Sequence, residues 1–345
     1  MNKKLLMAAV GAALVAGPMV AVHAAGATLY GHMHMSLDRQ DNDSGNEDGS
    51  MSSNASRIGV KGDEDLGGGL KAIYQLEAGV AAIDEGAGGL GGTLRNSFVG
   101  FAGSWGAVKL GRHDTPYKDL SRKLDNFNEQ IGDTRNIIGN ATYDKRVSNM
   151  IRYESPMFGG ANVVVQNTSN DGAEATAATN KDSSLGVNWT SGPLFLGAAW
   201  NEVGNATTND TTGKRLAGSY TFNDIVLGLL WESLSDIGGT SGHDRDTMGL
   251  FAALKMGNNL FKLSYFDADK YDDVANTAGK LWAAGVDHSF SKTTKIYFNY
   301  ASVDNDSVAT TNLASKYAGH GETEAPSITA GKSPTAFSLG TIIKF

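Results

Sequence analysis

Apolar side chains alternate with polar or small ones along most of this chain, in stretches of about ten residues that each end in a turn signal. A period of two residues predicts β-strands whose two faces lie in different environments. The stretch 225–232 is typical, and its apolar positions are Ile225, Leu227, Leu229 and Trp231. From residue 27 onwards no segment carries an apolar stripe of helical period over many turns, so the pattern predicts an all-β protein.

We count about sixteen such stretches, and the connections between them alternate in length. Short turns include 222–224 and 256–259, whereas long polar connections include 38–53, 81–93 and 114–145. Short turns at one rim and long loops at the other are typical of an outer-membrane barrel with an even number of strands. The pattern therefore predicts an antiparallel transmembrane β-barrel whose termini both lie at the short-turn rim.

Aromatic residues at the strand ends support a barrel in a membrane. The tryptophans all lie near the ends of predicted strands, where an interfacial girdle is expected. They are Trp105, Trp189, Trp200, Trp231 and Trp282. Tryptophan is also common near strand ends in soluble β-sandwiches, but the apolar faces here are long and almost free of charge. The final apolar stretch stops on Phe345, and a barrel requires such a strand to pair with the first one, because lipid does not tolerate an open edge.

Residues 1–24 have the three parts of a secretory signal peptide. Two early lysines are followed by the apolar run 5–15 and by small residues before a cleavage site after Ala24. A membrane anchor is the alternative, but glycines and a proline interrupt the apolar region, which falls short of the ~20 residues of a spanning helix. We expect an exported protein with a single transmembrane β-barrel domain over residues 25–345.

Composition narrows the class further. The chain contains 44 glycines, 6 prolines and no cysteine, which excludes a fold stapled by disulfides. Glycines without collagen periodicity indicate turns, bulges and closely packed strands. The formal net charge of −8 argues against nucleic acid as a partner.

Several short motifs, taken in their order along the chain, resemble those of the Gram-negative general-diffusion porins over essentially the whole mature chain. They are TLYG at 28–31, SRIGVKGDEDLG at 56–67, LKAIYQLE at 70–77, GAVKLGRHDTP at 106–116, IRYESP at 151–156 and the terminal Phe345. The resemblance implies a 16-stranded antiparallel transmembrane β-barrel with short periplasmic turns, long extracellular loops and a third loop folded into the lumen. It also implies a homotrimer in contact with outer-membrane lipid and lipopolysaccharide, and a channel for ions and small hydrophilic solutes.

The resemblance further implies a constriction between charged residues of the barrel wall and of the third loop, with a transverse electric field across a narrow aqueous channel. The wall candidates are His32, Arg57, Lys71, Arg95 and Arg152, and the loop candidates are Asp125, Glu129 and Asp133. His32 stands where some relatives carry lysine, which makes the local charge depend on pH.

Periodicity bears on these candidates independently. Strand parity points Arg57 inward, because it is out of phase with Ile58. By the same argument Arg95 points inward, because it is out of phase with Phe98. The three loop acids recur every four residues and would share a face if their segment is helical. The simpler interpretation is that the arginines line the lumen without a role in selectivity and that the loop is solvated outside the cell.

Other functions of such a barrel stay open. One is a channel specific for sugars, phosphate or organic acids, although no ladder of aromatic residues follows the predicted lumen. A second is a barrel hydrolase, which would need a nucleophile with a base; the sequence has no G-x-S-x-G motif and no obvious Ser-His pairing. A third is a plugged structural or adhesive barrel. We expect a channel and no enzyme.

Local patterns that suggest ligands carry less weight. The glycine-rich stretch 86–91 matches a dinucleotide fingerprint but has no βαβ context. The acid-rich stretch 38–48 lacks the glycine and glutamate spacing of a calcium loop. His32 and His34 share a strand face, yet two ligands are too few for a structural metal site. We therefore expect no cofactor and no bound metal.

Overall fold

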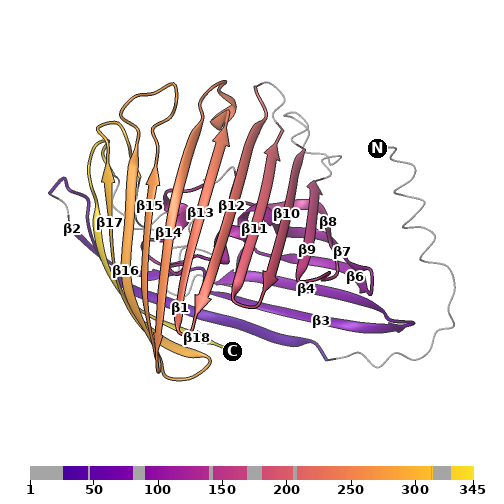
Figure 1. Ribbon diagram of the computed structural model, residues 1–345. Coiled ribbons are helices and arrows are strands. Elements are labelled where there is room, and N and C mark those ends of the chain that lie inside the picture. The colour runs from indigo at the N-terminus through magenta and orange to yellow at the C-terminus, as the bar shows by residue number, and fades with distance from the viewer. Residues whose placement is uncertain are drawn as a thin grey trace.

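The computed structural model describes residues 26–45, 47–80, 90–139, 143–168, 181–204, 208–311, 313 and 328–345. The signal peptide expected at residues 1–24 lies outside these ranges. No helix in the described ranges combines the length and apolar character needed to cross a bilayer. Figure 1 shows tilted strands that form one continuous wall, with the C-terminal end of the chain beside the first strand.

The described chain folds into eighteen strands of one sheet. The first nine are β1 (Thr28–Asp41), β2 (Glu47–Ser53), β3 (Arg57–Gly67), β4 (Leu70–Val80), β5 (Leu90–Leu94), β6 (Ser97–Gly103), β7 (Gly106–Asp114), β8 (Arg146–Glu154) and β9 (Ala161–Thr168). The others are β10 (Asp182–Ser191), β11 (Leu194–Val203), β12 (Thr211–Phe222), β13 (Ile225–Ser235), β14 (Arg245–Met256), β15 (Asn259–Ala268), β16 (Gly279–Ser289), β17 (Thr294–Asn305) and β18 (Thr335–Lys344). Helical turns are α2 (Pro116–Arg122), η1 (Thr134–Asn136) and η2 (Ile237–Gly239).

Two pairs of these strands are single wall strands with a break. β1 pairs with β2 along one half and with β3 along the other, so β2 and β3 form one interrupted strand. In the same way β4 pairs with both β5 and β6. The eighteen segments therefore make a closed barrel of sixteen antiparallel strands, which confirms the predicted fold class.

Closure depends on the pairing of β1 with β18. The register runs from His32 opposite Lys344 to Asp41 opposite Thr335. Beyond it, the amide of Gly31 donates to the carbonyl of Phe345 at 3.0 Å, and the amide of Phe345 donates back at 3.1 Å. A Cβ atom at position 31 would collide with the backbone carbonyl oxygen of Arg57 and would lie 2.7 Å from the ring of Phe345. Only glycine therefore fits here.

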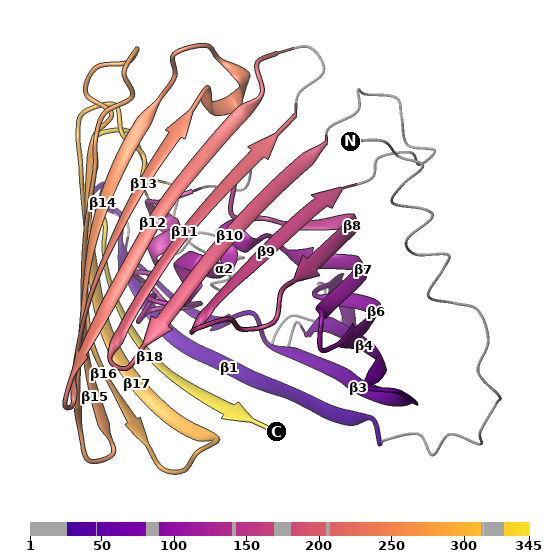
Figure 2. The same ribbon diagram turned by 45° about the vertical axis from the view of Figure 1, so that its right-hand side comes forward.

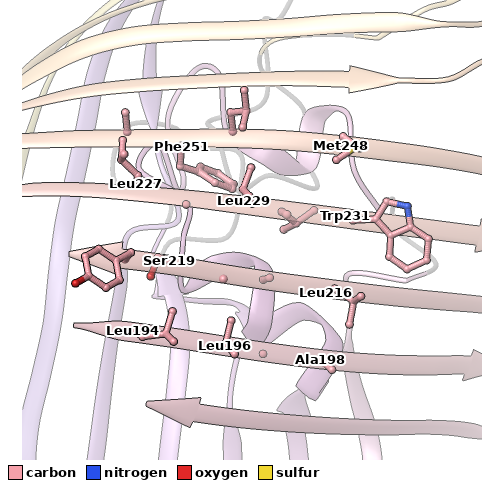
Figure 3. A pocket seen from close by; sticks show the side chains of 18 of the residues that line it. Leu194, Leu196, Ala198, Leu216, Ser219, Leu227, Leu229, Trp231, Met248 and Phe251 are labelled. Atoms are coloured by element: carbon pink, nitrogen blue, oxygen red, sulfur yellow. The ribbon is translucent and has the colours of Figure 1, made fainter. Parts of the chain in front are cut away.

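The outer face of the barrel is apolar. Leu227, Leu229 and Leu250 are exposed on it, and Figure 3 shows Leu227 and Leu229 among the side chains that line a hollow over β10 to β15. This hollow has a volume of about 1150 Å³ and an almost entirely apolar lining. Such a surface matches the acyl chains of a bilayer. The exposed Trp105, in the turn between β6 and β7, and Trp282 at the other rim fit the predicted girdle.

Two predicted loops are shorter than expected because the strands continue past the apolar pattern. β1 extends to Asp41 and β2 begins at Glu47, within the predicted loop 38–53. β5 begins at Leu90, within the predicted loop 81–93. Polar strand ends have the composition of a loop, although their backbones still pair. The glycine-rich stretch 86–91 therefore enters β5, and its first four residues lie outside the described ranges.

The connection between β7 and β8, residues 115–145, is called loop 3 below; it folds into the lumen, as expected. Figure 2 shows its helix α2 inside the ring of strands. Its fully buried side chains include Phe127, Ile131 and Ile138. They pack against inward-facing apolar residues of β13 to β17 and of the following loop, which are Leu230, Phe251, Phe266, Ala268, Leu281, Ala283, Ala301, Val303 and Leu313. The inner wall thus presents an apolar patch to these residues of loop 3.

A buried ion cluster fixes both limbs of loop 3 to this wall. Arg215 of β12 is fully buried, and its guanidinium binds both carboxylate oxygens of Asp144 at 2.9 Å. Arg215 also binds Glu232 of β13, which accepts a bond of 2.7 Å from the hydroxyl of Tyr117 and one of 2.6 Å from the amide of Gly139. The first and last parts of loop 3 are therefore held at one point.

We predict that Arg215→Met destabilises the barrel, because two buried carboxylates would lose their shared cation. The expected loss in free energy of unfolding is about 3–5 kcal/mol, measured by urea titration of tryptophan fluorescence in detergent. Lys214→Met is the matched control, since Lys214 is exposed on the outer face of the same strand. Equal stability of the two variants would contradict this role of Arg215.

Candidate functional site

Loop 3 presents one carboxylate, Glu129, to the opposite wall. Its Oε1 lies 2.9 Å from Nη1 of Arg57, 3.0 Å from Nη2 of Arg122 and 3.6 Å from Nη2 of Arg95. Burial alone would raise the pKa of Glu129, but these three guanidinium groups outweigh it and hold the pKa well below its usual value. A backbone φ of 62° at Glu129 turns the chain towards the wall at this point.

The two wall arginines stand at the breaks in the wall strands. Arg57 is the first residue of β3, directly after the break that follows β2. Arg95 lies in the break between β5 and β6, and its Nε donates to Glu77 of β4 at 2.7 Å. The hydroxyl of Tyr30 donates to the other oxygen of Glu77 at 2.9 Å. Glu77 thus orients Arg95 from within the wall.

The parity argument for Arg95 was correct in its result but not in its reason. Arg95 faces the lumen, but so does Phe98, whose ring lies 4.9 Å from Nζ of Lys109 and 5.7 Å from the ring of His113. The strand is interrupted between Leu94 and Ser97, so the alternation of faces does not continue across the break. His32 lies beside this site, with its Nε2 3.8 Å from Oε2 of Glu129 and 3.1 Å from the carbonyl of Ala55.

A second carboxylate, Asp114 at the end of β7, extends the cluster. It lies 3.1 Å from Lys118, 3.5 Å from Arg122 and 3.1 Å from Arg146. Ion pairs of the described residues link five cationic groups to three carboxylates in one network. Its members are Arg57, Arg95, Lys118, Arg122 and Arg146, with Glu77, Asp114 and Glu129. The network therefore carries two positive charges in excess when His32 is neutral.

Arg152 belongs to a neighbouring, balanced group. It pairs with Asp119 at 2.8 Å and with Glu154 at 2.7 Å, and Lys109 binds the same oxygen of Glu154 at 2.7 Å. Its Nη1 also donates to the backbone carbonyl of Asp114 at 2.9 Å. Arg152 therefore adjoins the main network without an ion pair to Glu129.

Three candidates lie apart from the wall contact. Lys71 pairs with Asp63 at 2.9 Å, and its side chain is 52% exposed near the short turn between β3 and β4. Asp125 and Asp133 hold loop 3 together from inside. Asp125 accepts from the amides of Phe127 at 2.8 Å and Thr134 at 3.2 Å. The structure brings only Glu129 of the three loop acids to the wall.

The shared helical face expected for the loop acids is absent, because residues 125–133 form turns. Asp133 accepts a bond of 2.7 Å from the amide of Glu129 and pairs with Arg135 at 2.6 Å. Burial and the charge of Asp133 raise the pKa of Asp125. Asp125 and Asp133 thus hold the loop together, whereas Glu129, four residues from each, faces the wall arginines.

Sequence reasoning missed Glu77, Asp114, Lys118 and Arg146 as members of the network. Glu77 gave a signal, since it is a carboxylate on the inward face of a predicted strand. Arg122 was one of several charged residues of the long loop, and nothing in its local sequence distinguishes it from Lys123. The contacts that select Arg122 come from Glu129 and Asp114 and depend on how the loop folds.

A metal ion has three potential ligands here. Ligand atoms of His32, His34 and Glu129 all lie within 4.8 Å of one another, so loop 3 supplies the third ligand that the two histidines lacked. Glu129 is already shared by three guanidinium groups, however, and the excess positive charge repels a divalent cation. Nε2 of His34 is also bonded to the hydroxyl of Tyr297 at 2.9 Å. The electrostatics of the site favour anions over metals.

Known proteins share this architecture. A family model described as Gram-negative porin matches residues 8–308. Outer membrane porin protein 32 of Delftia acidovorans is 30% identical over 353 aligned positions, which cover 95% of this chain and 96% of that protein. Major outer membrane protein P.IB of Neisseria sicca is 26% identical and covers 69% of this chain and 75% of its own length.

Solved structures give the same result. The anion-selective porin from Comamonas acidovorans superposes with a TM-score of 0.77 at 28% identity, over 93% of this chain and 99% of that one. OmpF of Salmonella typhi, solved as a complex with daunomycin, has a TM-score of 0.69 at 14% identity, over 92% and 97% of the two chains. At that identity the likeness concerns the fold alone.

Proposed function

Because this chain belongs to the Gram-negative porin family, we propose that the network around Glu129 is the constriction of its channel and gives the channel a preference for anions. The protein is an outer-membrane porin, a water-filled channel for passive diffusion of ions and small hydrophilic solutes. The observation that carries the proposal is the excess of two positive charges in a network that spans loop 3 and the wall.

The local charge decides selectivity, although the whole chain has a formal charge of −8. Charges separated by more than about 8 Å are largely screened at physiological ionic strength, so remote acidic loops contribute little at the constriction. In a narrow passage with low-dielectric walls the nearby guanidinium groups set the potential. The solved relative from Comamonas acidovorans is itself named anion-selective, which supports the same sign here.

The charges are not arranged in two separated rows, which is the arrangement expected to produce a transverse field. The acid contacts the wall arginines directly, with 2.9 Å between Glu129 and Arg57. Such contact neutralises part of the cationic wall and joins loop 3 to it. We therefore infer that the net positive charge of the network selects for anions. Glu129 weakens the attraction of the network for anions, so that a bound anion can be released and pass through the channel.

Three further expectations complete the proposal. Residues 1–24 serve as a cleaved signal peptide, and the mature barrel forms a homotrimer in lipid and lipopolysaccharide. OmpT of Vibrio cholerae, which shares the fold, is known in a trimer form. We expect no catalytic activity. A channel specific for phosphate or organic acids remains the alternative that a cationic constriction favours, and block of the current by such solutes would identify it.

We predict that Arg57→Ala and Arg152→Ala each lower the preference for chloride over potassium. Arg57→Ala removes one positive charge from the network, and Arg152→Ala leaves the adjoining group of Lys109, Asp119 and Glu154 with a net negative charge. The expected change in the permeability ratio is about twofold per charge, as the interaction is partly screened. The measurement is the reversal potential of the refolded mature protein in planar bilayers under a KCl gradient. Lys71→Ala is the control, since Lys71 lies apart from both groups, near the short turn between β3 and β4. Unchanged potentials in both arginine variants would contradict the proposal.

We predict that the anion preference falls as the pH rises from about 7 to 9. Burial lowers the pKa of Lys118 to about 8. The negative charge of Asp114 opposes this shift, and the positive charges of Arg122, Arg135 and Arg146 add to it. Lys118 is charged below this pKa and neutral above it, so the network loses one positive charge at high pH. Reversal potentials at both pH values test this.

The control for the pH effect is Lys118→Arg, because the guanidinium stays charged over this range. Its reversal potential should change little between the two pH values. A pH dependence as large as that of the unmodified protein would show that another group titrates.

A further inference from the structure

We propose that a row of three side chains on the lumen wall, Lys61, Gln75 and Phe98, binds aromatic carboxylates that pass through the channel. The row lies on β3, β4 and β6, in the half of the wall that carries the network around Glu129. The proposal rests on the proposed function, because its solute is an anion that the network is proposed to admit. It adds a solute class that the charge of the network does not by itself select.

The register of the sheet places the three side chains side by side. Lys61 of β3 is directly opposite Gln75 of β4, and Gln75 is directly opposite Phe98 of β6. Residues opposite each other in a sheet point to the same face, so Lys61 and Gln75 point into the lumen with Phe98. Neighbouring strands lie about 4.8 Å apart, which places Lys61 and Phe98 about 10 Å apart along the wall. An aromatic ring that carries a carboxylate group fits within this span.

The row lies beside the constriction, on its periplasmic side. Gln75 precedes Glu77 by two residues on the same face of β4, and Glu77 binds Arg95 at 2.7 Å. Two residues of a strand span about 7 Å. β4 starts at the short turn after β3, so Gln75 is nearer than Glu77 to the short-turn rim. An anion released from the network towards the periplasm therefore reaches this row next.

Lys61 supplies a cation that no carboxylate neutralises. Its side chain is exposed, and within the part of the chain that the structure describes it forms no ion pair. Its Nζ lies 5.0 Å from the centre of the Tyr30 ring, and this attraction keeps the ammonium group at the wall. By contrast, Lys109 on the same wall is paired with Glu154 at 2.7 Å. Lys61 is therefore available to the carboxylate of a solute.

Phe98 supplies an aromatic surface that is open to the lumen. Its ring is half-buried, whereas the inward-facing rings of Phe251 and Phe266 are buried in the apolar cluster with loop 3. Gly111 of β7, directly opposite Phe98, has no side chain to cover the ring. The ring of a solute can therefore stack against Phe98.

Gln75 lies between the cation and the ring and adds a hydrogen-bonding group. Its Nε2 donates to the carbonyl of Asn96 at 3.1 Å, which turns the amide towards the break between β5 and β6. An amide nitrogen carries two N–H groups, so the second one can donate to a carboxylate oxygen. The row thus offers an ammonium group, an amide and a ring in this order.

This combination selects one class of solute. Chloride and phosphate would bind Lys61 but would gain nothing from Phe98. An aliphatic carboxylate would lack the stacking, and a neutral aromatic compound would lack the charge. An aromatic carboxylate uses both groups at once, so we expect it to bind more tightly than a saturated acid of similar size.

The test compares benzoate with cyclohexanecarboxylate, two carboxylates of the same charge and similar size that differ in aromaticity. Each is added to the unmodified mature protein in planar bilayers at neutral pH, and the concentration that halves the chloride current is measured. Benzoate should halve the current at a concentration about three- to tenfold lower, the ratio expected for one aromatic contact. Equal half-blocking concentrations would overturn the proposal.

Phe98→Leu assigns the effect to the row. It should remove the advantage of benzoate, because leucine keeps an apolar side chain without a ring. Phe101→Leu is the matched control, since Phe101 is on the outer face of the same strand and is 39% exposed, and the advantage should persist in it. A Phe98→Leu channel in which benzoate keeps its full advantage would count against the row.

Lys61→Met covers the case in which Phe98→Leu fails to fold. It should raise the half-blocking concentrations of both acids by about threefold, because both use the ammonium group. Lys71→Met is its matched control, since Lys71 on β4 is already paired with Asp63, and it should change neither concentration. Unchanged concentrations in Lys61→Met would also overturn the proposal.

Failure of this proposal is separable from failure of the proposed function. Reversal potentials in a KCl gradient report the charge of the constriction, whereas the ratio of the two half-blocking concentrations reports the row. An anion preference with equal block by both acids would keep the constriction and remove the row. A channel without anion preference that still favours benzoate would keep the row and remove the selective constriction.

Discussion

The buried cluster of Arg215, Asp144 and Glu232 is the constraint on which the constriction depends. A guanidinium that is buried away from water must remain paired with its carboxylates, because an unpaired buried charge destabilises the fold by several kcal/mol. Both limbs of loop 3 meet at this point, through Tyr117 near its start and Asp144 near its end. The loop can therefore leave the wall only if this cluster breaks. In the proposed constriction, the position of loop 3 thus depends on ion pairs that no permeating solute needs to touch.

The two halves of the lumen wall differ in the side chains that they present. The half formed by β13 to β17 carries an apolar patch, which Phe127 and Ile131 of loop 3 cover. The half that includes Arg57 and Arg95 carries the charged network around Glu129. A charged pathway and a conventional hydrophobic core therefore coexist inside one barrel. This division explains how a long loop stays folded within a water-filled channel in a chain that has no cysteine.

The sequence predicted the barrel well, because strand alternation is local and survives from one strand to the next. The antiparallel barrel of about sixteen strands and the inward direction of Arg57 follow from period two and from short motifs. Alternation says which face a residue takes but nothing about contacts across the lumen. Lys71 has the inward parity, yet it lies near the rim and pairs with Asp63. Depth within the barrel is not encoded in the pattern.

The loop could not be predicted to the same extent, for a physical reason. Asp125 and Asp133 bind amides of their own loop, whereas Glu129 faces the wall, and all three look alike in sequence. Their roles depend on a turn at positive φ and on partners from distant strands. Arg215 gave no signal beyond an inward charge, although it holds the loop in place.

The pairing of β1 with β18, sealed where Gly31 lies beneath Phe345, has a consequence for biogenesis. The edge of β1 finds its partner only after every other strand has been translated and exported. Contacts between such distant segments form slowly, and until then the unpaired edges and apolar faces are exposed to aggregation. Keeping these edges away from other chains until the last strand is in place is therefore a condition for the ring to close.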